Sequence, residues 1–134
     1  MGPIQDFNAQ RLYPGERLKK KKSIQRLFGE GHKKNFFPLL LFYLEYKPED
    51  VPYHKVLISV PKKNFKSSVI RNRIRRRIRE AFRKQKVALY NNHSGFPFLL
   101  GYLYISKTVS TYTDIERSVL SSLRYLTKQN GIKK

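Results

Sequence analysis

The sequence predicts an α+β fold in which helices pack on a small β-sheet. Two patterns of hydrophobic residues support it. Apolar residues recur three and four positions apart, as on one face of a helix, at 70–82 and 115–126. Short apolar or alternating runs, as in strands, occur at 36–46, 53–60 and 98–106. The 40% hydrophobic content, with nine Phe and nine Tyr, is typical of a folded domain and not of a disordered basic tail. With a short helix near the start, the predicted order is helix, strands, helix, strand, helix.

Residues 1–134 are expected to form one domain with an irregular arm at its N-terminus. The arm, residues 1–16, has no hydrophobic period and contains two prolines. Four consecutive lysines at 19–22 follow it. No internal repeat and no interior linker divides the rest of the chain, so a single hydrophobic core is expected.

A short first helix is predicted after the lysines. Ser23 is a suitable N-cap, and Gly29 or Gly31 would end the helix. The apolar residues at helical spacing are Ile24, Leu27 and Phe28. They fit a plain packing role as well as a ligand-binding one.

Three segments have the character of strands. Residues 36–46 are aromatic and aliphatic, with an interruption expected near Pro38. Residues 53–60 alternate and end before Pro61, because proline lacks the amide that a strand ladder needs. The residues expected on one face of that strand are Val56, Ile58 and Val60. Residues 98–106 are almost continuously apolar, which favours a central strand.

The last helix is predicted to begin at a capping box, in which Thr113 is followed three residues later by Glu116. Its apolar side is formed by Ile115, Val119, Leu123 and Leu126. The helix is expected to end near Gly131.

Residues 71–83 are the most unusual part of the chain, because seven of these thirteen residues are Arg and only Glu80 is acidic. On a helix capped by Ser67 or Ser68 and running to about Tyr90, one side would be apolar. That side consists of Ile70, Ile74, Ile78, Ala81 and Phe82. The remaining circumference would present arginines, many of them as like-charged pairs four residues apart, which repel each other.

We call this predicted helix, with residues 71–83, the arginine helix. The repulsion among its arginines is better explained by binding to an external polyanion than by a surface that only faces water. Residues 62–86 contain twelve basic residues and one acidic residue, so +11 of the chain's net charge of +20 lies here. Arginine binds phosphate through two parallel hydrogen bonds, which suits nucleic acid. The predicted nucleic-acid contacts are Lys62, Lys63, Arg71, Asn72, Arg73, Arg75, Arg76, Arg77, Arg79 and Arg83.

Several classes of protein are excluded by composition. The absence of cysteine excludes disulfides and zinc–thiolate sites. The longest apolar run, residues 36–44, contains Pro38 and is too short to cross a bilayer. Polar residues interrupt the N-terminus, where a signal peptide would need an apolar stretch. We expect a soluble intracellular protein without a membrane partner.

The motifs around the arginine helix resemble those of the bacterial ribonuclease P protein component. They are Ile58-Ser59-Val60-Pro61-Lys62-Lys63, and then Val69 to Arg76 with its Arg71-Asn72-Arg73 core. The resemblance extends upstream to residues 18–31 and downstream to 98–106 and 114–128, about 110 residues in all.

The resemblance implies a single two-layer α+β sandwich with the order helix, three strands, helix, strand, helix. Its sheet would have four strands, and a rare left-handed crossover would carry the arginine helix. It also implies a protein subunit that binds the catalytic ribonuclease P RNA and assists removal of the 5′ leader of precursor tRNA in the bacterial cytoplasm. The RNA would supply the active site, Mg²⁺ would serve the holoenzyme, and the protein would need no cofactor or obligate protein partner of its own.

A cleft between the first helix and the sheet would hold the unpaired 5′ leader, with Ile24 and Phe28 as its candidate residues. The family often has an aromatic residue at the position of Ile24, so this chain would offer one stacking ring there in place of two.

Catalysis by the protein itself finds little support in the sequence. The nine acidic residues are scattered, and the pair Asp114 and Glu116 is explained by a helix N-terminus, where negative charge is favoured. No metal site is predicted. The alternative is a non-enzymatic basic RNA-binding protein of ribosomal or RNA-chaperone type, which the composition fits equally well. A duplex-DNA reader is less favoured, because apart from Asn72 the helix offers few side chains that read bases.

Overall fold

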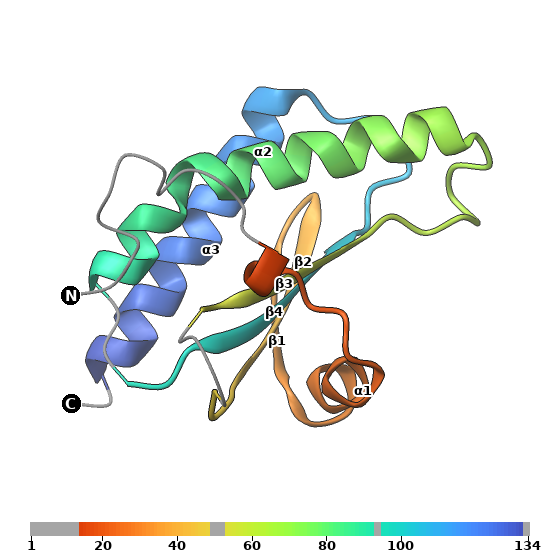
Figure 1. Ribbon diagram of the computed structural model, residues 1–134. Coiled ribbons are helices and arrows are strands. Elements are labelled where there is room, and N and C mark those ends of the chain that lie inside the picture. The colour runs from red at the N-terminus through yellow and green to blue at the C-terminus, as the bar shows by residue number, and fades with distance from the viewer. Residues whose placement is uncertain (1–13, 49–52, 93–94, 133–134) are drawn as a thin grey trace.

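The computed structural model describes residues 14–48, 53–92 and 95–132, which form a four-stranded sheet with three α-helices (Figure 1). A 3₁₀ turn at Pro14–Glu16 precedes α1 (Lys21–Glu30), β1 (His32–Phe36), β2 (Leu39–Glu45), β3 (Lys55–Ser59), α2 (Ser68–Asn92), β4 (Phe98–Tyr104) and α3 (Tyr112–Ile132). The α+β class is confirmed, as is the order of helix, three strands, helix, strand and helix.

The strand order in the sheet is β1-β2-β4-β3. β2 pairs with both β1 and β4 in antiparallel fashion, whereas β3 and β4 are parallel neighbours. The helix α2 connects these two parallel strands, so it is the crossover helix. β4 has a strand on either side, which confirms that 98–106 contains a central strand. The left-handed sense of the crossover stays a prediction.

Helices cover both faces of the sheet, because α2 and α3 lie on one side and α1 lies on the other (Figure 1). Alternate residues of β4 serve the two faces, as the pleat of a strand requires. Leu100 and Tyr102 belong to the main core beneath α2 and α3. Leu99 packs with Leu27 of α1 in a smaller cluster.

The predicted apolar sides of the two long helices form the main core. Ile74, Ile78, Ala81 and Phe82 of α2 have no exposed surface. The corresponding residues of α3, Ile115, Val119, Leu123 and Leu126, are also buried. Both sets belong to one cluster with the sheet residues Val56, Val60 and Leu100, so the helical period in the sequence identified the docking side of each helix.

The interruption expected near Pro38 is a turn between two strands. β1 ends at Phe36 and β2 begins at Leu39, and the peptide bond between Phe37 and Pro38 is cis. Most of β1 lies before the predicted strand, at His32-Lys33-Lys34-Asn35. These polar residues are exposed at the edge of the sheet, so they carry no hydrophobic pattern that could have indicated a strand.

The prediction that Ser23 caps the first helix is wrong. α1 begins at Lys21, the N-cap residue is Lys20, and no side chain makes a capping hydrogen bond there. The C-terminal prediction holds for Gly31, whose amide donates to the carbonyl of Leu27.

Of the predicted caps of the other two helices, the one of α2 is confirmed and the one of α3 is wrong. Ser67 caps α2, since its hydroxyl accepts the amide of Ile70 at 3.4 Å. The capping box at Thr113 is wrong, because the hydroxyl of Thr111 accepts the amide of Asp114 at 3.2 Å. The true cap lies two residues earlier, and α3 correspondingly begins at Tyr112.

The end of the predicted N-terminal arm is ordered against the sheet, while residues 1–13 lie outside the described residues. After the 3₁₀ turn, Arg17 forms a parallel bridge with Val56 of β3. The amide of Leu18 donates to the Val56 carbonyl at 3.0 Å. Residues 17 and 18 therefore extend the sheet at its β3 edge.

Replacing Ile74 or Ile78 with Ala should lower the free energy of unfolding by about 2–5 kcal/mol, because each side chain is fully buried beneath α2. Urea denaturation of the two variants measures this loss. Val69→Ala is the matched control, since Val69 lies in the same helix with 66% of its surface exposed. A loss below 1 kcal/mol at both isoleucines would contradict their role in docking α2.

Candidate nucleic-acid interface

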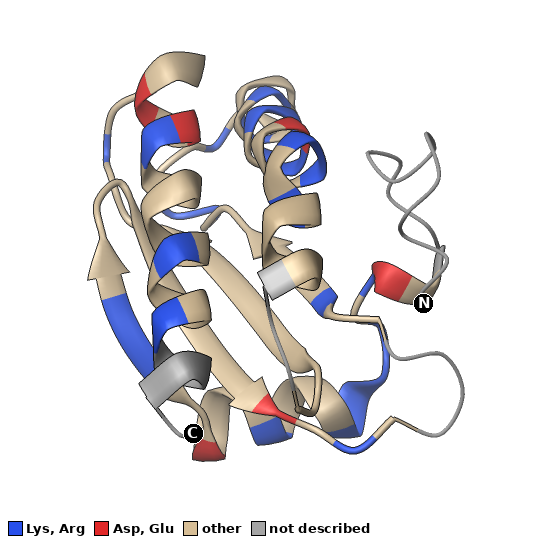
Figure 2. Ribbon diagram, turned by 90° about the vertical axis from the view of Figure 1, so that its left-hand side faces the viewer, with Lys and Arg blue, Asp and Glu red and all other residues tan. Residues whose placement is uncertain are grey.

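The arginine helix and the loop before it present cations at one end of the molecule. Lys62 and Lys63 are exposed in a turn that closes where the amide of Asn64 donates to the carbonyl of Pro61. α2 begins a few residues later at Ser68. Figure 2 shows Lys and Arg on successive turns of α2, with further cations on α3 and β1.

Some arginines of α2 are bound within the protein. Arg71 donates to the carbonyls of Phe65 and Lys66, at 2.7 and 3.0 Å, and so holds the loop against the helix. Arg77 donates at 2.5 Å to the carbonyl of Ser110, in the loop between β4 and α3. These two guanidinium groups therefore tie α2 to the loop that precedes it and to the loop between β4 and α3.

Two other arginines have partners on α2 itself. Arg75 donates to the side-chain oxygen of Asn72 at 2.8 Å. Arg83 makes a two-pronged contact with Glu80, with N···O distances of 3.1 and 2.7 Å. This hydrogen-bonded pairing lowers the pKa of Glu80, so the only acidic residue of the helix stays ionised and offsets Arg83.

Three arginines have no such counter-charge. Arg73, Arg76 and Arg79 are exposed, and no carboxylate of the described residues forms an ion pair with them. Together with Lys62 and Lys63 they form what we call the open cationic face. Its cations have their hydrogen-bond donors directed to solvent, where a phosphate backbone could accept them.

Lys86 belongs to the basic stretch 62–86 but not to the open cationic face. It is fully buried, and its ammonium group lies 2.5 Å from a carboxylate oxygen of Glu16. By helical spacing, Lys86 falls on the same side of α2 as Arg79 and Arg83. Sequence reasoning missed this pairing because Glu16 is 70 residues away.

The candidate leader residues lie where α1 meets the sheet. Ile24 is half-buried in the small cluster around Leu27 and Leu99. Phe28 is 39% exposed and packs edge-to-face on Phe42 of β2, with ring centroids 4.6 Å apart. Part of an aromatic side chain is thus accessible beside the sheet.

Sequence reasoning missed the sheet residues beneath α1. Gly101 of β4 lies under the helix, and a Cβ there would sit 3.1 Å from Leu27 and 3.4 Å from Phe28. The absence of a side chain at Gly101 lets α1 approach the sheet closely. A glycine within an apolar strand was the signal that could have indicated this approach.

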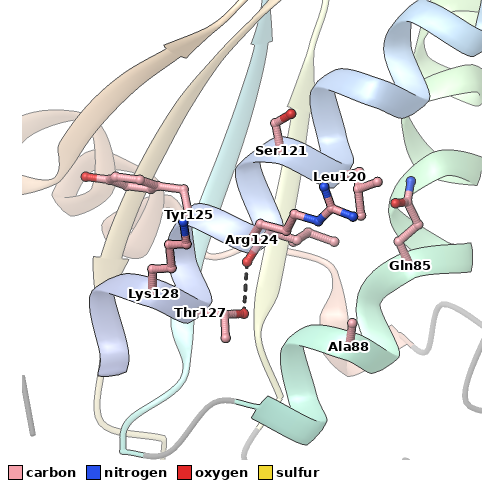
Figure 3. Close-up of a pocket in the computed structure, with 9 residues that line it drawn as sticks. Gln85, Ala88, Leu120, Ser121, Arg124, Tyr125, Thr127 and Lys128 are labelled. Atoms are coloured by element: carbon pink, nitrogen blue, oxygen red, sulfur yellow. Dashed lines mark hydrogen bonds between the residues drawn. The ribbon is translucent and has the colours of Figure 1, made fainter. Parts of the chain in front are cut away.

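A cavity of about 680 Å³ lies between α2 and α3, on the opposite side of the sheet from α1 (Figure 3). The side chains of Gln85 and Arg124 lie along it, with Leu120 and Ala88 nearby. No described residue that lines it is Asp, Glu or His. It therefore offers no carboxylate or imidazole group for catalysis.

The described residues hold no group of three or more His, Cys, Asp or Glu side chains that could bind a metal ion. His54 has a structural role, since its Nδ1 accepts the amide of Phe98 at 2.9 Å. His32 lies against the ring of Tyr43 on the β1 edge, and His93 is outside the described residues. Among the described residues, no helix has the length and apolar character needed to cross a bilayer.

Comparison with known proteins agrees with this architecture. The family model named Ribonuclease P matches residues 12–123. The ribonuclease P protein component of Porphyromonas gingivalis strain W83 is 32% identical over 114 residues, covering 84% of this chain and 83% of that protein. The one from Borreliella burgdorferi strain ZS7 is 39% identical over 99 residues, covering 74% and 79%.

Solved structures share the fold. The RNase P protein of Staphylococcus aureus superposes with a TM-score of 0.63 at 23% identity, covering 82% of this chain and 94% of that one. The RNase P protein of Thermotoga maritima gives a TM-score of 0.65 at 19% identity, with coverages of 82% and 96%. The matched family region spans the arginine helix, α1 and the whole sheet, and this chain therefore belongs to the ribonuclease P protein component family.

Proposed function

We propose that this subunit binds the catalytic RNA of ribonuclease P together with the 5′ leader of precursor tRNA, and so assists endonucleolytic removal of the leader. The observation that carries the proposal is the open cationic face on a member of this family. The RNA supplies the active site in this proposal, and Mg²⁺ acts in the holoenzyme. The subunit works in the bacterial cytoplasm, without a membrane, an obligate protein partner or a cofactor of its own.

The catalytic RNA is bound through phosphates along the loop and α2. Lys62, Lys63, Arg73, Arg76 and Arg79 supply cations that no described carboxylate neutralises. The remaining candidates are Arg71, Asn72, Arg75, Arg77 and Arg83. A guanidinium group has five N–H donors, so these arginines can hold their intramolecular partners and still donate to phosphate.

The leader is bound on the α1 side of the sheet, away from the core that α2 and α3 cover. Ile24 and Phe28 are the proposed contacts, because they stand where α1 meets β2 and β4. The half-exposed ring of Phe28 can stack on one base, and such stacking is sequence-tolerant. A leader of any sequence could then be accommodated.

The direct test is cleavage of precursor tRNA by a bacterial ribonuclease P RNA with and without this protein, over a range of Mg²⁺ concentrations. We expect the protein to lower the Mg²⁺ concentration needed for cleavage. Tight RNA binding without any change in the Mg²⁺ requirement would favour the alternative, a non-enzymatic RNA-binding protein.

Binding to the catalytic RNA should weaken steeply with salt, because each neutralised phosphate contributes about 0.7–0.9 to the slope of log affinity against log salt. Arg73→Ala and Arg76→Ala should each reduce that slope by about 1 while leaving the melting temperature unchanged. Arg124→Ala is the matched control, since Arg124 is an exposed arginine on α3. Equal effects of all three substitutions would mean that net charge matters and the open cationic face does not.

The protein alone should not cleave precursor tRNA at any Mg²⁺ concentration, because the proposal assigns it no catalytic residue. His32→Gln with His93→Gln, and separately Asp114→Asn with Glu116→Gln, should leave the single-turnover chemical step of the holoenzyme nearly unchanged. His54 is kept, since its ring accepts the amide of Phe98. A collapse of the chemical step with RNA binding intact would place the active site on the protein.

Phe28→Ala should weaken holoenzyme binding of leader-bearing tRNA more than that of mature tRNA, by roughly the 1–3 kcal/mol that one stacked base contributes. Binding curves with leaders of increasing length measure the difference. Phe37→Ala is the control, because Phe37 is a more exposed ring, at 67%, in the turn between β1 and β2. Equal losses for both RNAs would make Phe28 an ordinary packing residue.

A further inference from the structure

A buried polar cluster joins the segment before α1 to the far half of α2. Glu16 and Lys86 both have no exposed side-chain surface, and their charged groups are 2.5 Å apart. The second carboxylate oxygen of Glu16 accepts the hydroxyl of Tyr90 at 2.8 Å. Both oxygens are therefore bound by residues one helical turn apart on α2.

The cluster continues into the sheet. The hydroxyl of Tyr90 accepts the amide of His54, which directly precedes β3, at 2.9 Å. The Nδ1 atom of His54 in turn accepts the amide of Phe98, the first residue of β4, at 2.9 Å. One chain of contacts thus links Glu16, α2 and the beginnings of two neighbouring strands.

Stability alone does not explain such a cluster. Removing two charges from water costs several kcal/mol per ion, and apolar residues of similar size often serve equally well. Burial lowers the pKa of Lys86, while the hydrogen bond and charge of Glu16 act in the opposite direction. A buried ion pair must keep its partners in contact, whereas apolar contacts tolerate small displacements, so the pair restricts where residue 16 can lie.

Glu16 is followed directly by the residues that lead along the sheet edge into α1. Arg17 and Leu18 bridge to Val56 at the edge of β3, and Leu18 packs on Leu27 of α1. α1 begins only three residues later, at Lys21. Phe28 lies one residue beyond Leu27, so the contact at Glu16 ties the proposed leader site to the arginine helix.

We propose that Glu16 is a positioning residue, which fixes α1 relative to α2 through its contacts with Lys86 and Tyr90. The proposed leader site on α1 and the arginine helix would then bind one RNA assembly at a fixed relative position. This inference rests on the proposed function. It also assigns Lys86 to the interior and not to the RNA contacts, although Lys86 lies on the same side of α2 as Arg79.

The test uses holoenzyme reconstituted from the full-length chain and a bacterial ribonuclease P RNA, with the variants Glu16→Gln, Tyr90→Phe and the double replacement Glu16→Leu with Lys86→Met. Two quantities are compared: the preference for leader-bearing over mature tRNA, and hydrogen exchange at the Leu18 amide, which donates to Val56. The Ile78 amide in α2 reports on global folding.

Glu16→Gln should accelerate exchange at Leu18, leave Ile78 protected and reduce the leader preference by roughly 2- to 30-fold, the range for residues that couple two sites without touching either ligand. Affinity for the catalytic RNA should stay within about twofold, since Glu16 lies outside the open cationic face. Tyr90→Phe should act in the same direction but less strongly, because the ion pair remains.

The double replacement removes the ion pair without leaving a buried unpaired charge, and such an exchange for apolar residues is often neutral for stability. It therefore separates loss of the ion pair from loss of folding. Across all variants, the leader preference should follow the protection of Leu18. Loss of preference with Leu18 fully protected, or retained preference with Leu18 exposed, would overturn the inference. If the unsubstituted holoenzyme shows no leader preference, the proposed function fails first.

Discussion

The burial of one side of α2 on the sheet is the interaction on which the rest of the structure depends. Ile74 and Ile78 have no exposed surface, and each such side chain contributes about 1.5–3 kcal/mol on burial. Like-charged arginine pairs four residues apart cost only a few tenths of a kcal/mol each. Burial therefore outweighs the repulsion, and α2 can hold a dense array of arginines without an RNA partner present. The same helix connects β3 and β4, so the core that supports it is also the core of the sheet.

The arginines of α2 fall into two groups, those bound within the protein and those exposed to solvent, which the sequence does not distinguish. Arg71 binds the carbonyl of Phe65 in the loop before α2, and Arg77 binds the carbonyl of Ser110 in the loop between β4 and α3. Arg73, Arg76 and Arg79 remain open to solvent, without carboxylate partners among the described residues. The bound arginines keep the neighbouring loops in place, and the open ones present a cationic surface that is already formed. A preformed surface loses less conformational entropy when it binds phosphate.

The two faces of the sheet are covered unequally by the helices. α2 and α3 enclose a large apolar core on one face, whereas α1 covers only part of the other and leaves Phe28 half-exposed. The buried cluster of Glu16, Lys86 and Tyr90 connects these regions across the β3 edge. It joins Glu16 to residues 70 and 74 positions away, so it couples the N-terminal segment directly to the far half of the arginine helix.

The α+β class, the apolar sides of α2 and α3, the central place of β4 and the cationic character of residues 62–86 were all predictable, because each leaves a local period or composition in the sequence. Local patterns did not reveal β1, whose polar residues form an exposed edge strand with no hydrophobic alternation. Only the family resemblance implied a third strand before α2. The caps at Ser23 and Thr113 were also misplaced. Thr111 and Thr113 offer the same chemistry, and the backbone geometry selects Thr111. α1 begins before Ser23, at Lys21, without any side-chain cap. Only the tertiary structure decided which cations face solvent. Lys86 and Arg79 look alike in the sequence, yet Glu16 buries one of them through a contact that no local pattern encodes.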